Sequence, residues 1–200
     1  MSSSIQPHPG ALQTLFESAA GSPLPEWPHA AAAITVQQVA PGETVFLQDA
    51  VHPYLHAVQR GLLKLSYLKS DGTEWIKSFA HDGGFFASVS ALRPGGRTSF
   101  MVVAMEPSTL ERIDHRVLEE LASRHLAWSR ALQVMTLVFA ARKEQREREL
   151  LTLAPMERYL AFCDAHPNLE KRVPQKDLAR HLGVTPVGLN RIVMRVRRAG

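Results

Sequence analysis

Residues 173–198, VPQKDLARHLGVTPVGLNRIVMRVRR, constrain the fold of this chain more than any other stretch. Leu178 and Leu182 are spaced to lie on one face of a first helix. Gly183 can adopt the left-handed conformation that ends a helix, and Thr185 followed by proline is typical of the start of another. The stretch therefore predicts two short helices joined by a tight turn, the helix-turn-helix pattern.

The second predicted helix separates apolar from basic residues. Its apolar face carries Leu189, Ile192, Val193 and Val196, and its outer face carries Asn190, Arg191, Arg195, Arg197 and Arg198. Residues 171–200 contain eight Lys or Arg and one Asp, a net charge of +7, whereas the whole chain carries +4 and the remainder therefore −3. A basic end on an acidic body indicates double-stranded DNA as the partner of that end.

Base-reading and backbone-binding candidates follow from helical geometry. The first turns of a recognition helix contact base edges, and Arg or Asn can bond guanine or adenine through two hydrogen bonds. The predicted base-contacting residues are Val187, Gly188, Asn190, Arg191 and Arg195. The predicted phosphate contacts are Lys176, Arg180, Arg197 and Arg198, with Gln175 and Thr185 as neutral donors near the helix starts.

The first half of the chain has the pattern of a β-rich domain. Short stretches with β-branched residues run from about residue 35 to residue 113, separated by glycine-containing turns. Asp71-Gly72 between LLKLSYL and EWIKSF predicts a hairpin. Even spacing of short strands is typical of an antiparallel jelly roll. Residues 11–20 are a helix candidate before it, and the polar residues 1–10 are expected to be frayed.

Helical patterns return at Asp114. DHRVLEELASRH (114–125) predicts a short helix and residues 127–151 a long one. Residues with 4-3-4 spacing predict a coiled-coil-like dimer seam along the long helix, and the off-seam Val134, Leu137 and Val138 are expected to pack on the β domain. The seam consists of Trp128, Leu132, Met135 and Phe139. The alternative is a helix packed wholly inside one subunit.

These patterns predict an α+β fold in three parts. We expect a β jelly-roll domain over 1–125, a long connecting and dimerisation helix over 126–152, and a helix-turn-helix domain over 153–200. Within the last part, residues 154–167 predict a helix with Met156, Tyr159, Leu160 and Cys163 on its buried side.

The composition limits the remaining possibilities. Cys163 is the only cysteine, which excludes an internal disulfide and a four-cysteine iron–sulfur cluster. As a buried thiol it is expected to be inert. The N-terminal residues lack a basic region before an apolar run, so no signal peptide is expected. No stretch reaches the length of about 18 apolar residues that spans a membrane, so a cytoplasmic chain is expected.

The order of β domain, long helix and helix-turn-helix resembles the Crp/Fnr family of bacterial transcription regulators. The resemblance covers about residues 15–198 and is carried by PGETVFLQ (41–48), GGFFASVSALRPGGRTSFMVVA (83–104) and ERYLAF…VPQKDLARHLGVTPVGLNRI (157–192). It implies a homodimer that binds DNA, an effector site in the β domain, and RNA polymerase as a further candidate partner. Because the sequence stops soon after the second helix, the β-hairpin wing of longer members is expected to be missing.

The resemblance also places a candidate effector pocket at Phe86, Ala87, Ser88, Arg97 and Thr98. Arg97-Thr98 matches the Arg-Ser/Thr pair that holds the cyclic phosphate in nucleotide-binding members, and such a pair suits an anion. The Gly-Glu pair that binds the ribose is replaced by Ala87-Ser88, which weakens or removes that contact. The sequence therefore points away from cyclic AMP and leaves the effector and cofactor unknown.

Two other classes of protein stay open at this point. A jelly roll with histidines is also compatible with a cupin-like metal enzyme, and His52 and His56 lie four residues apart. His52, His56 and His81 qualify as haem ligands by residue type only, so no metal site is assigned. A ligand-binding signalling module without DNA binding is the other alternative. No Ser-His-Asp, paired-carboxylate or phosphate-loop pattern occurs, so no catalytic residues are expected.

Overall fold

The computed structural model describes residues 10–199, and the expectation for residues 1–9 lies outside the described residues. The described chain divides into two compact units. The first extends to Lys64 and resumes over Phe79–Leu137, and the second combines Leu65–Ser78 with the chain from Val138 onward. The tip of one hairpin thus belongs with the C-terminal helices. The three-part division expected from the sequence stays a prediction.

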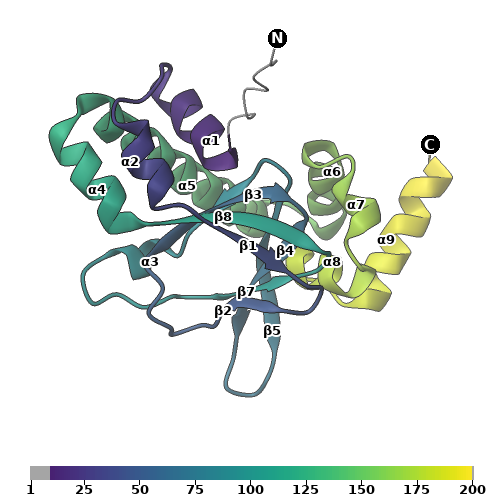
Figure 1. The fold of residues 1–200 in the computed structure, drawn as a ribbon. Coiled ribbons are helices and arrows are strands. Elements are labelled where there is room, and N and C mark those ends of the chain that lie inside the picture. Colours follow the sequence, from purple (N-terminus) through teal and green to yellow (C-terminus); the bar gives the residue numbers. More distant parts are fainter. Residues whose placement is uncertain (1–9, 200) are drawn as a thin grey trace, which may run out of the picture. The chain divides into compact units, whose positions relative to one another are not determined.

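Two four-stranded antiparallel sheets form the β-rich part (Figure 1). One has the order β1-β8-β3-β6, with strands Thr35–Val39, Ser108–Asp114, Tyr54–Arg60 and Phe85–Phe86. The other has the order β2-β7-β4-β5, with strands Thr44–Phe46, Met101–Ala104, Leu62–Leu68 and Glu74–His81. The boundary between the compact units falls within β4 and β5. The predicted jelly roll is confirmed.

The register of the first sheet decides which side chains are buried. In this sheet, Leu55 is opposite Ile113 and Val58 is opposite Leu110, and all four are buried. Val39 at the end of β1 is buried opposite Ser108. Each directly opposed pair shares a face, and because side chains alternate along a strand the two pairs lie on opposite faces, so both faces of the sheet are covered at this point.

A buried glutamate fixes the first helix, α1 (Ala11–Ala20), to the sheet. Glu111 of β8 accepts hydrogen bonds from the backbone N–H groups of Ala11 and Leu12 at 3.1 and 2.7 Å. These are two of the donors that a helix start leaves unpaired. A Cβ on Gly10 would lie 2.6 Å from a Glu111 carboxylate oxygen, so the glycine allows this close approach.

The first unit contains further helices besides α1. They are α2 (Trp27–Ala32), α3 (Val89–Leu92), α4 (His115–Arg124) and the beginning of α5 (Leu126–Thr152). Asp114 caps α4 by accepting a hydrogen bond from the Arg116 N–H at 2.9 Å. The helix predicted over 114–125 therefore forms, with its first residue acting as the cap.

The long helix forms as predicted, and two of the four residues of the predicted dimer seam are buried within the chain itself. Trp128 is fully buried, donates its indole N–H to the Pro25 carbonyl at 2.8 Å, and packs on Phe16 and Trp27. Met135 is buried as well, whereas Leu132 and Phe139 are half-buried. Trp128 and Met135 are thus occupied by the chain itself.

The exposed apolar residues of α5 lie about two positions further along. Val134 is 41% exposed and Leu137 is 61% exposed, although both were expected to pack on the β domain. In a 3.6-residue helix a shift of two residues moves the face to roughly the opposite side. The face that was expected to pack on the β domain is therefore exposed at Val134 and Leu137, and the position of the dimer seam stays a prediction.

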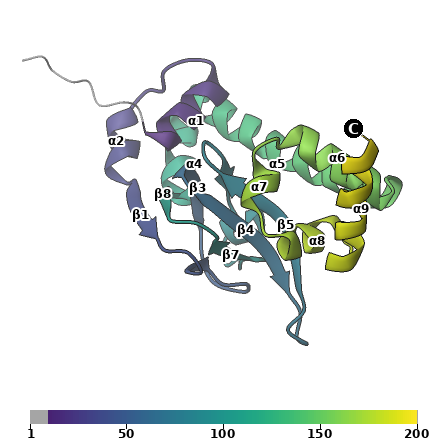
Figure 2. The ribbon, with the colours of Figure 1, turned by 90° about the vertical axis from the view of Figure 1, so that its right-hand side faces the viewer.

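The second unit contains the β4–β5 hairpin tip, the end of α5 and four further helices (Figure 2). They are α6 (Pro155–Ala165), α7 (Leu169–Arg172), α8 (Gln175–Leu182) and α9 (Pro186–Ala199). The hairpin turn forms at Asp71-Gly72 as predicted, with Gly72 at φ 79° and the Thr73 N–H donating to the Asp71 carboxylate at 2.8 Å.

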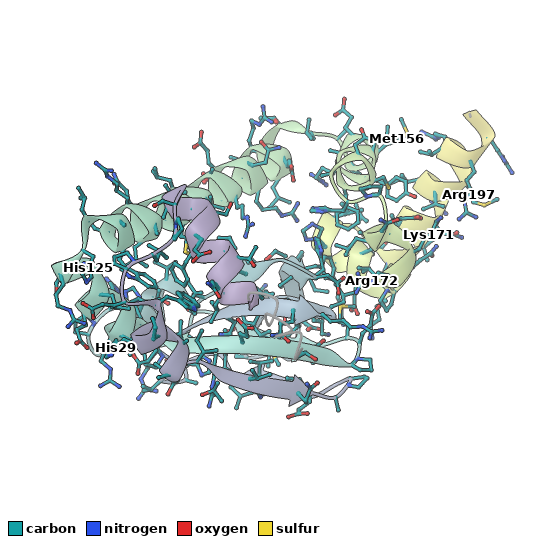
Figure 3. The ribbon with its side chains drawn as sticks, turned by 45° about the horizontal axis from the view of Figure 1, so that its top comes forward. His29, His125, Met156, Lys171, Arg172 and Arg197 are labelled. Atoms are coloured by element: carbon teal, nitrogen blue, oxygen red, sulfur yellow. The ribbon has the colours of Figure 1, made fainter. Side chains whose placement is uncertain are left out.

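The buried face of α6 differs from the expected one. Tyr159 is buried as predicted. The other buried residue of α6 is Phe162, whereas Met156 and Leu160, which were expected on the buried side, are exposed. The reason is tertiary, because Phe162 packs edge-on against His181 of α8 at 5.4 Å between ring centroids. Met156 lies on the outside of this group of helices (Figure 3).

Candidate nucleic-acid interface

The turn between α8 and α9 has the geometry that its residues dictate. Gly183 takes the left-handed conformation at φ 70°, and the Val184 N–H donates to the Ala179 carbonyl at 3.0 Å. Thr185 accepts a hydrogen bond from the Gly188 N–H at 3.1 Å on its hydroxyl, the bond of a helix N-cap. Helix α9 then begins at Pro186. The predicted helix-turn-helix is present.

Burial orients the two helices. Leu178, Leu182 and Leu189 are buried almost completely, so the apolar faces predicted for both helices face inward. His181, between the two leucines of α8, is buried against Phe162. Burying one face of each helix leaves the opposite face of α9 in solvent.

The exposed face of α9 carries the predicted base-reading side chains. Val187 is 63% exposed, and Asn190, Arg191 and Arg195 are exposed as well. Met194 belongs to the same face and is exposed, three residues after Arg191. Met194 is not among the residues predicted from the sequence to contact DNA. Its helical spacing from Val187 and Arg191 nevertheless places it on the same face as they are. A polarisable thioether here offers a contact for a thymine methyl group.

The predicted phosphate contacts fall into two groups. Gln175, Lys176, Arg197 and Arg198 are exposed. Figure 3 shows Arg197 on α9 and two further basic residues, Lys171 and Arg172, on the same group of helices. Arg180 is different, because its guanidinium donates to the Glu74 carboxylate of β5 at 2.6 Å.

A cleft of about 780 Å³ lies beside this ion pair, within the second unit. The hairpin side of the cleft is formed by Thr73, Glu74 and Trp75. The opposite side is formed by Pro155, Arg180, Gly183, Val184, Thr185, Gly188 and Ile192. Three of the predicted DNA-binding residues, Arg180, Thr185 and Gly188, therefore border the cleft, and the base-reading residues Val187, Asn190 and Arg191 do not.

The candidate effector residues cluster in the first unit, where much of their polar chemistry is already used. The Thr98 hydroxyl donates to the Leu47 carbonyl at 2.6 Å and accepts from the Ala50 N–H at 2.9 Å. The exposed Arg97 donates one N–H to the Asp49 carbonyl at 2.7 Å. The two side chains thus fasten the loop before β7 to the loop after β2.

Ser88 has a similar structural role. Its buried hydroxyl accepts from the Ser99 N–H at 3.0 Å and lies 3.1 Å from the Ser90 hydroxyl. Ser90 in turn donates to the Arg97 carbonyl at 2.8 Å. Phe86 and Ala87 beside it are buried. The segment that the resemblance assigned to ribose binding is therefore bonded to its own loop.

Two histidines share the core between Phe46 and Phe86. The Nε2 atoms of His52 and His56 lie 3.4 Å apart, and the His56 ring stacks on Phe86 at 4.7 Å between centroids. Burial lowers the pKa of His52 to about 4 and that of His56 to about 3. Among residues 10–199, no group of three or more His, Cys, Asp and Glu side chains is arranged to hold a metal ion.

Cys163 is half-buried rather than part of the core. Burial raises the pKa of its thiol, which disfavours the reactive thiolate form. Over the described residues, no helix is long and apolar enough to cross a membrane.

The structure thus combines a β roll, a long helix and a helix-turn-helix whose second helix has an exposed basic face. Residues 36–125 match the family model described as a cyclic nucleotide-binding domain. The nitrogen fixation regulation protein FixK of Rhizobium meliloti (strain 1021) is 26% identical over 164 residues, which cover 78% of this chain and 72% of the relative.

Solved structures share the architecture. FixK2 from Bradyrhizobium japonicum aligns with a TM-score of 0.74 at 20% identity, over 84% of this chain and 86% of that chain. A transcriptional regulator of the Crp/Fnr family from Eubacterium rectale aligns with a TM-score of 0.66 at 14% identity, over 86% and 82% of the two chains. The chain therefore shares its fold with these structures and carries a match to the cyclic nucleotide-binding domain, in agreement with the resemblance found in the sequence.

Proposed function

We propose that the chain is a homodimeric transcription regulator that binds DNA through α8 and α9. The observation that carries the proposal is the face of α9. Its apolar residues are buried, and Val187, Asn190, Arg191 and Arg195 stand exposed on the other side. Such a face suits the major groove, where Arg reads guanine and Asn reads adenine. FixK, a nitrogen fixation regulation protein, supports the same class.

Replacing Arg191 by alanine should weaken binding to a duplex that the wild-type chain enriches from a random pool by about 1–3 kcal/mol. The reason is the loss of a bidentate contact to one base pair. Fluorescence anisotropy at fixed salt measures the affinity, and the same titration on a scrambled duplex measures the sequence-independent part. Arg130→Ala on the exposed surface of α5 is the charge-matched control. An equal loss on both duplexes would show that Arg191 contacts phosphate instead.

We infer that the dimer forms along the exposed face of α5, not along the face first predicted. Val134 and Leu137 are apolar and exposed, and Ala141 follows at coiled-coil spacing. Two recognition helices related by this axis would read successive half-sites about 34 Å apart. The exposed arginines then bind phosphates on either side of each half-site.

The Leu137→Glu variant should therefore sediment as a monomer at micromolar concentration, because a buried glutamate pair in the seam is strongly unfavourable. Analytical ultracentrifugation compares it with wild type. The matched control is Leu126→Glu, since Leu126 is 65% exposed at the first turn of the same helix. If both variants stay dimeric, the contact lies elsewhere.

We propose that the β roll responds to a small effector other than cyclic AMP. Arg97 is exposed and donates one of its five N–H groups to the Asp49 carbonyl, which leaves capacity for an anion. In contrast, the Thr98 and Ser88 hydroxyls are committed to their own loops. RNA polymerase is a further proposed partner, on the family resemblance alone. The metal-enzyme alternative is not proposed, since no observation favours it.

A further inference from the structure

The ion pair between Glu74 and Arg180 joins two segments 106 residues apart in the chain. Its atoms lie 2.6 Å apart, and the glutamate and arginine side chains are only 14% and 31% exposed. Asp177 of the same helix lies 3.6 Å from the guanidinium. Arg180, which is predicted to bind a DNA phosphate, thus already binds the Glu74 carboxylate.

The hairpin tip also lies close to the start of the recognition helix. Trp75 and Thr73 line the same cleft as Thr185 and Gly188, at the N-terminus of α9. The tip is a formed structure, because Lys69 donates its N–H to the Thr73 carbonyl at 3.0 Å and places its ammonium over the Trp75 ring at 5.8 Å. A preformed tip can hold its carboxylate in place without ordering a loop first.

The contact occupies a predicted phosphate ligand and leaves the base-reading side chains outside it. Arg180 and Thr185, which border the cleft, are predicted phosphate ligands, and Gly188 beside them has no side chain to read a base. Val187, Asn190 and Arg191, which carry the base-reading role, do not line the cleft and are exposed. Phosphate contacts set affinity and register, whereas base contacts set sequence preference.

We propose that the β4–β5 hairpin tip, residues 69–75, is an autoinhibitory element in which the Glu74 carboxylate takes the place of a DNA phosphate on Arg180. The inference rests on the proposed DNA binding of α8 and α9. A guanidinium binds carboxylate and phosphate with the same paired N–H geometry, so the two anions compete for it. Because hairpin and DNA compete for Arg180, a change that moves the hairpin away from Arg180 raises the affinity for DNA. By the same thermodynamic linkage, DNA binding moves the hairpin away from Arg180.

The test compares Glu74→Gln with wild type by anisotropy at one salt concentration. The probes are the duplex enriched by the wild-type chain and its scrambled counterpart. Glu74→Gln should bind both duplexes about twofold to fivefold more tightly, the range for one lost ion pair, and leave their affinity ratio unchanged. Glu144→Gln on α5 removes the same charge from an exposed position and is the control. Equal affinities of the two variants for both duplexes would overturn the proposal.

A double-mutant cycle separates competition between Glu74 and DNA for Arg180 from the general effect of removing one negative charge. Arg180→Gln should weaken binding, and adding Glu74→Gln to it should give no further gain. An undiminished gain in that background would overturn the proposal. If wild type enriches no duplex at all, the proposed function itself fails, an outcome visible before any variant is made.

A second measurement does not depend on the stability of the variants. Wild-type protein labelled with 5-fluorotryptophan reports on Trp75 by ¹⁹F NMR, with Trp75→Phe assigning the resonance. Adding the enriched duplex should shift the Trp75 signal as the hairpin leaves the cleft, while the fully buried Trp128 keeps its shift. An unmoved Trp75 signal at saturating duplex would contradict release of the hairpin.

Discussion

Replacing Trp128 by alanine should lower the free energy of unfolding by about 3–5 kcal/mol, the cost of emptying a large aromatic site in a packed core. Trp128 is 0% exposed, packs on Phe16 at 5.3 Å and on Trp27 at 5.9 Å between ring centroids, and donates to the Pro25 carbonyl. The variant loses these contacts and leaves that carbonyl without its indole donor. Urea unfolding followed by circular dichroism measures the change.

The matched control is Leu126→Ala, two residues away on the same helix. Leu126 is exposed, so its truncation should change the free energy of unfolding by no more than about 0.5 kcal/mol. The experiment also decides between the two faces of α5. A Trp128→Ala chain that keeps its stability but sediments as a monomer would restore the seam first predicted for Trp128 and Met135.

The buried face of α5 could not be predicted from the sequence. Both faces of residues 126–139 are apolar, and periodicity gives the same spacing for a seam through Trp128 and one through Val134. The choice is made by residues far away in sequence, since the Trp128 partner Phe16 lies on α1 and its hydrogen-bond acceptor is Pro25. Local pattern locates the helix but not which face it buries.

The helix-turn-helix was predictable because its signals are local. The Gly183 turn, the Thr185 cap and the start at Pro186 each depend on a few neighbouring residues, and all three form. The effector loops depend instead on Thr98 bonding to Leu47 and Ala50, about fifty residues earlier, which no motif encodes. The Glu74–Arg180 pair is of the same kind, because tertiary packing alone brings the two residues together.

The buried histidines give the protein a built-in sensitivity to acid. Burial is the main cause that lowers the pKa of His56 and that of His181 to about 3, each with a smaller repulsion from a nearby arginine, Arg112 and Arg146 respectively. Repulsion from the neighbouring His52 also lowers the pKa of His56. In the unfolded chain these imidazoles return to the ordinary pKa of about 6.5. Below that pH the unfolded state takes up protons that the folded state cannot.

Stability should therefore be greatest above about pH 6.5 and fall progressively as the pH drops toward the folded-state values. From pH 7.5 to pH 5, each fully buried histidine should remove about 1–2 kcal/mol from the free energy of unfolding. Most carboxylates are still ionised at pH 5, because their ordinary pKa values lie near 4, so the histidines dominate this window. Urea titrations at several pH values measure the slope.

His56→Gln should flatten that slope, because an amide cannot take up the proton, even if the variant is less stable at pH 7.5. His29→Gln is the control, since His29 is exposed on α2 (Figure 3). An identical slope in wild type and His56→Gln would mean that His56 is protonated without unfolding the first unit. In that case the His52–His56 pair would tolerate charge in the folded state, and the acid sensitivity would have to come from His181 alone.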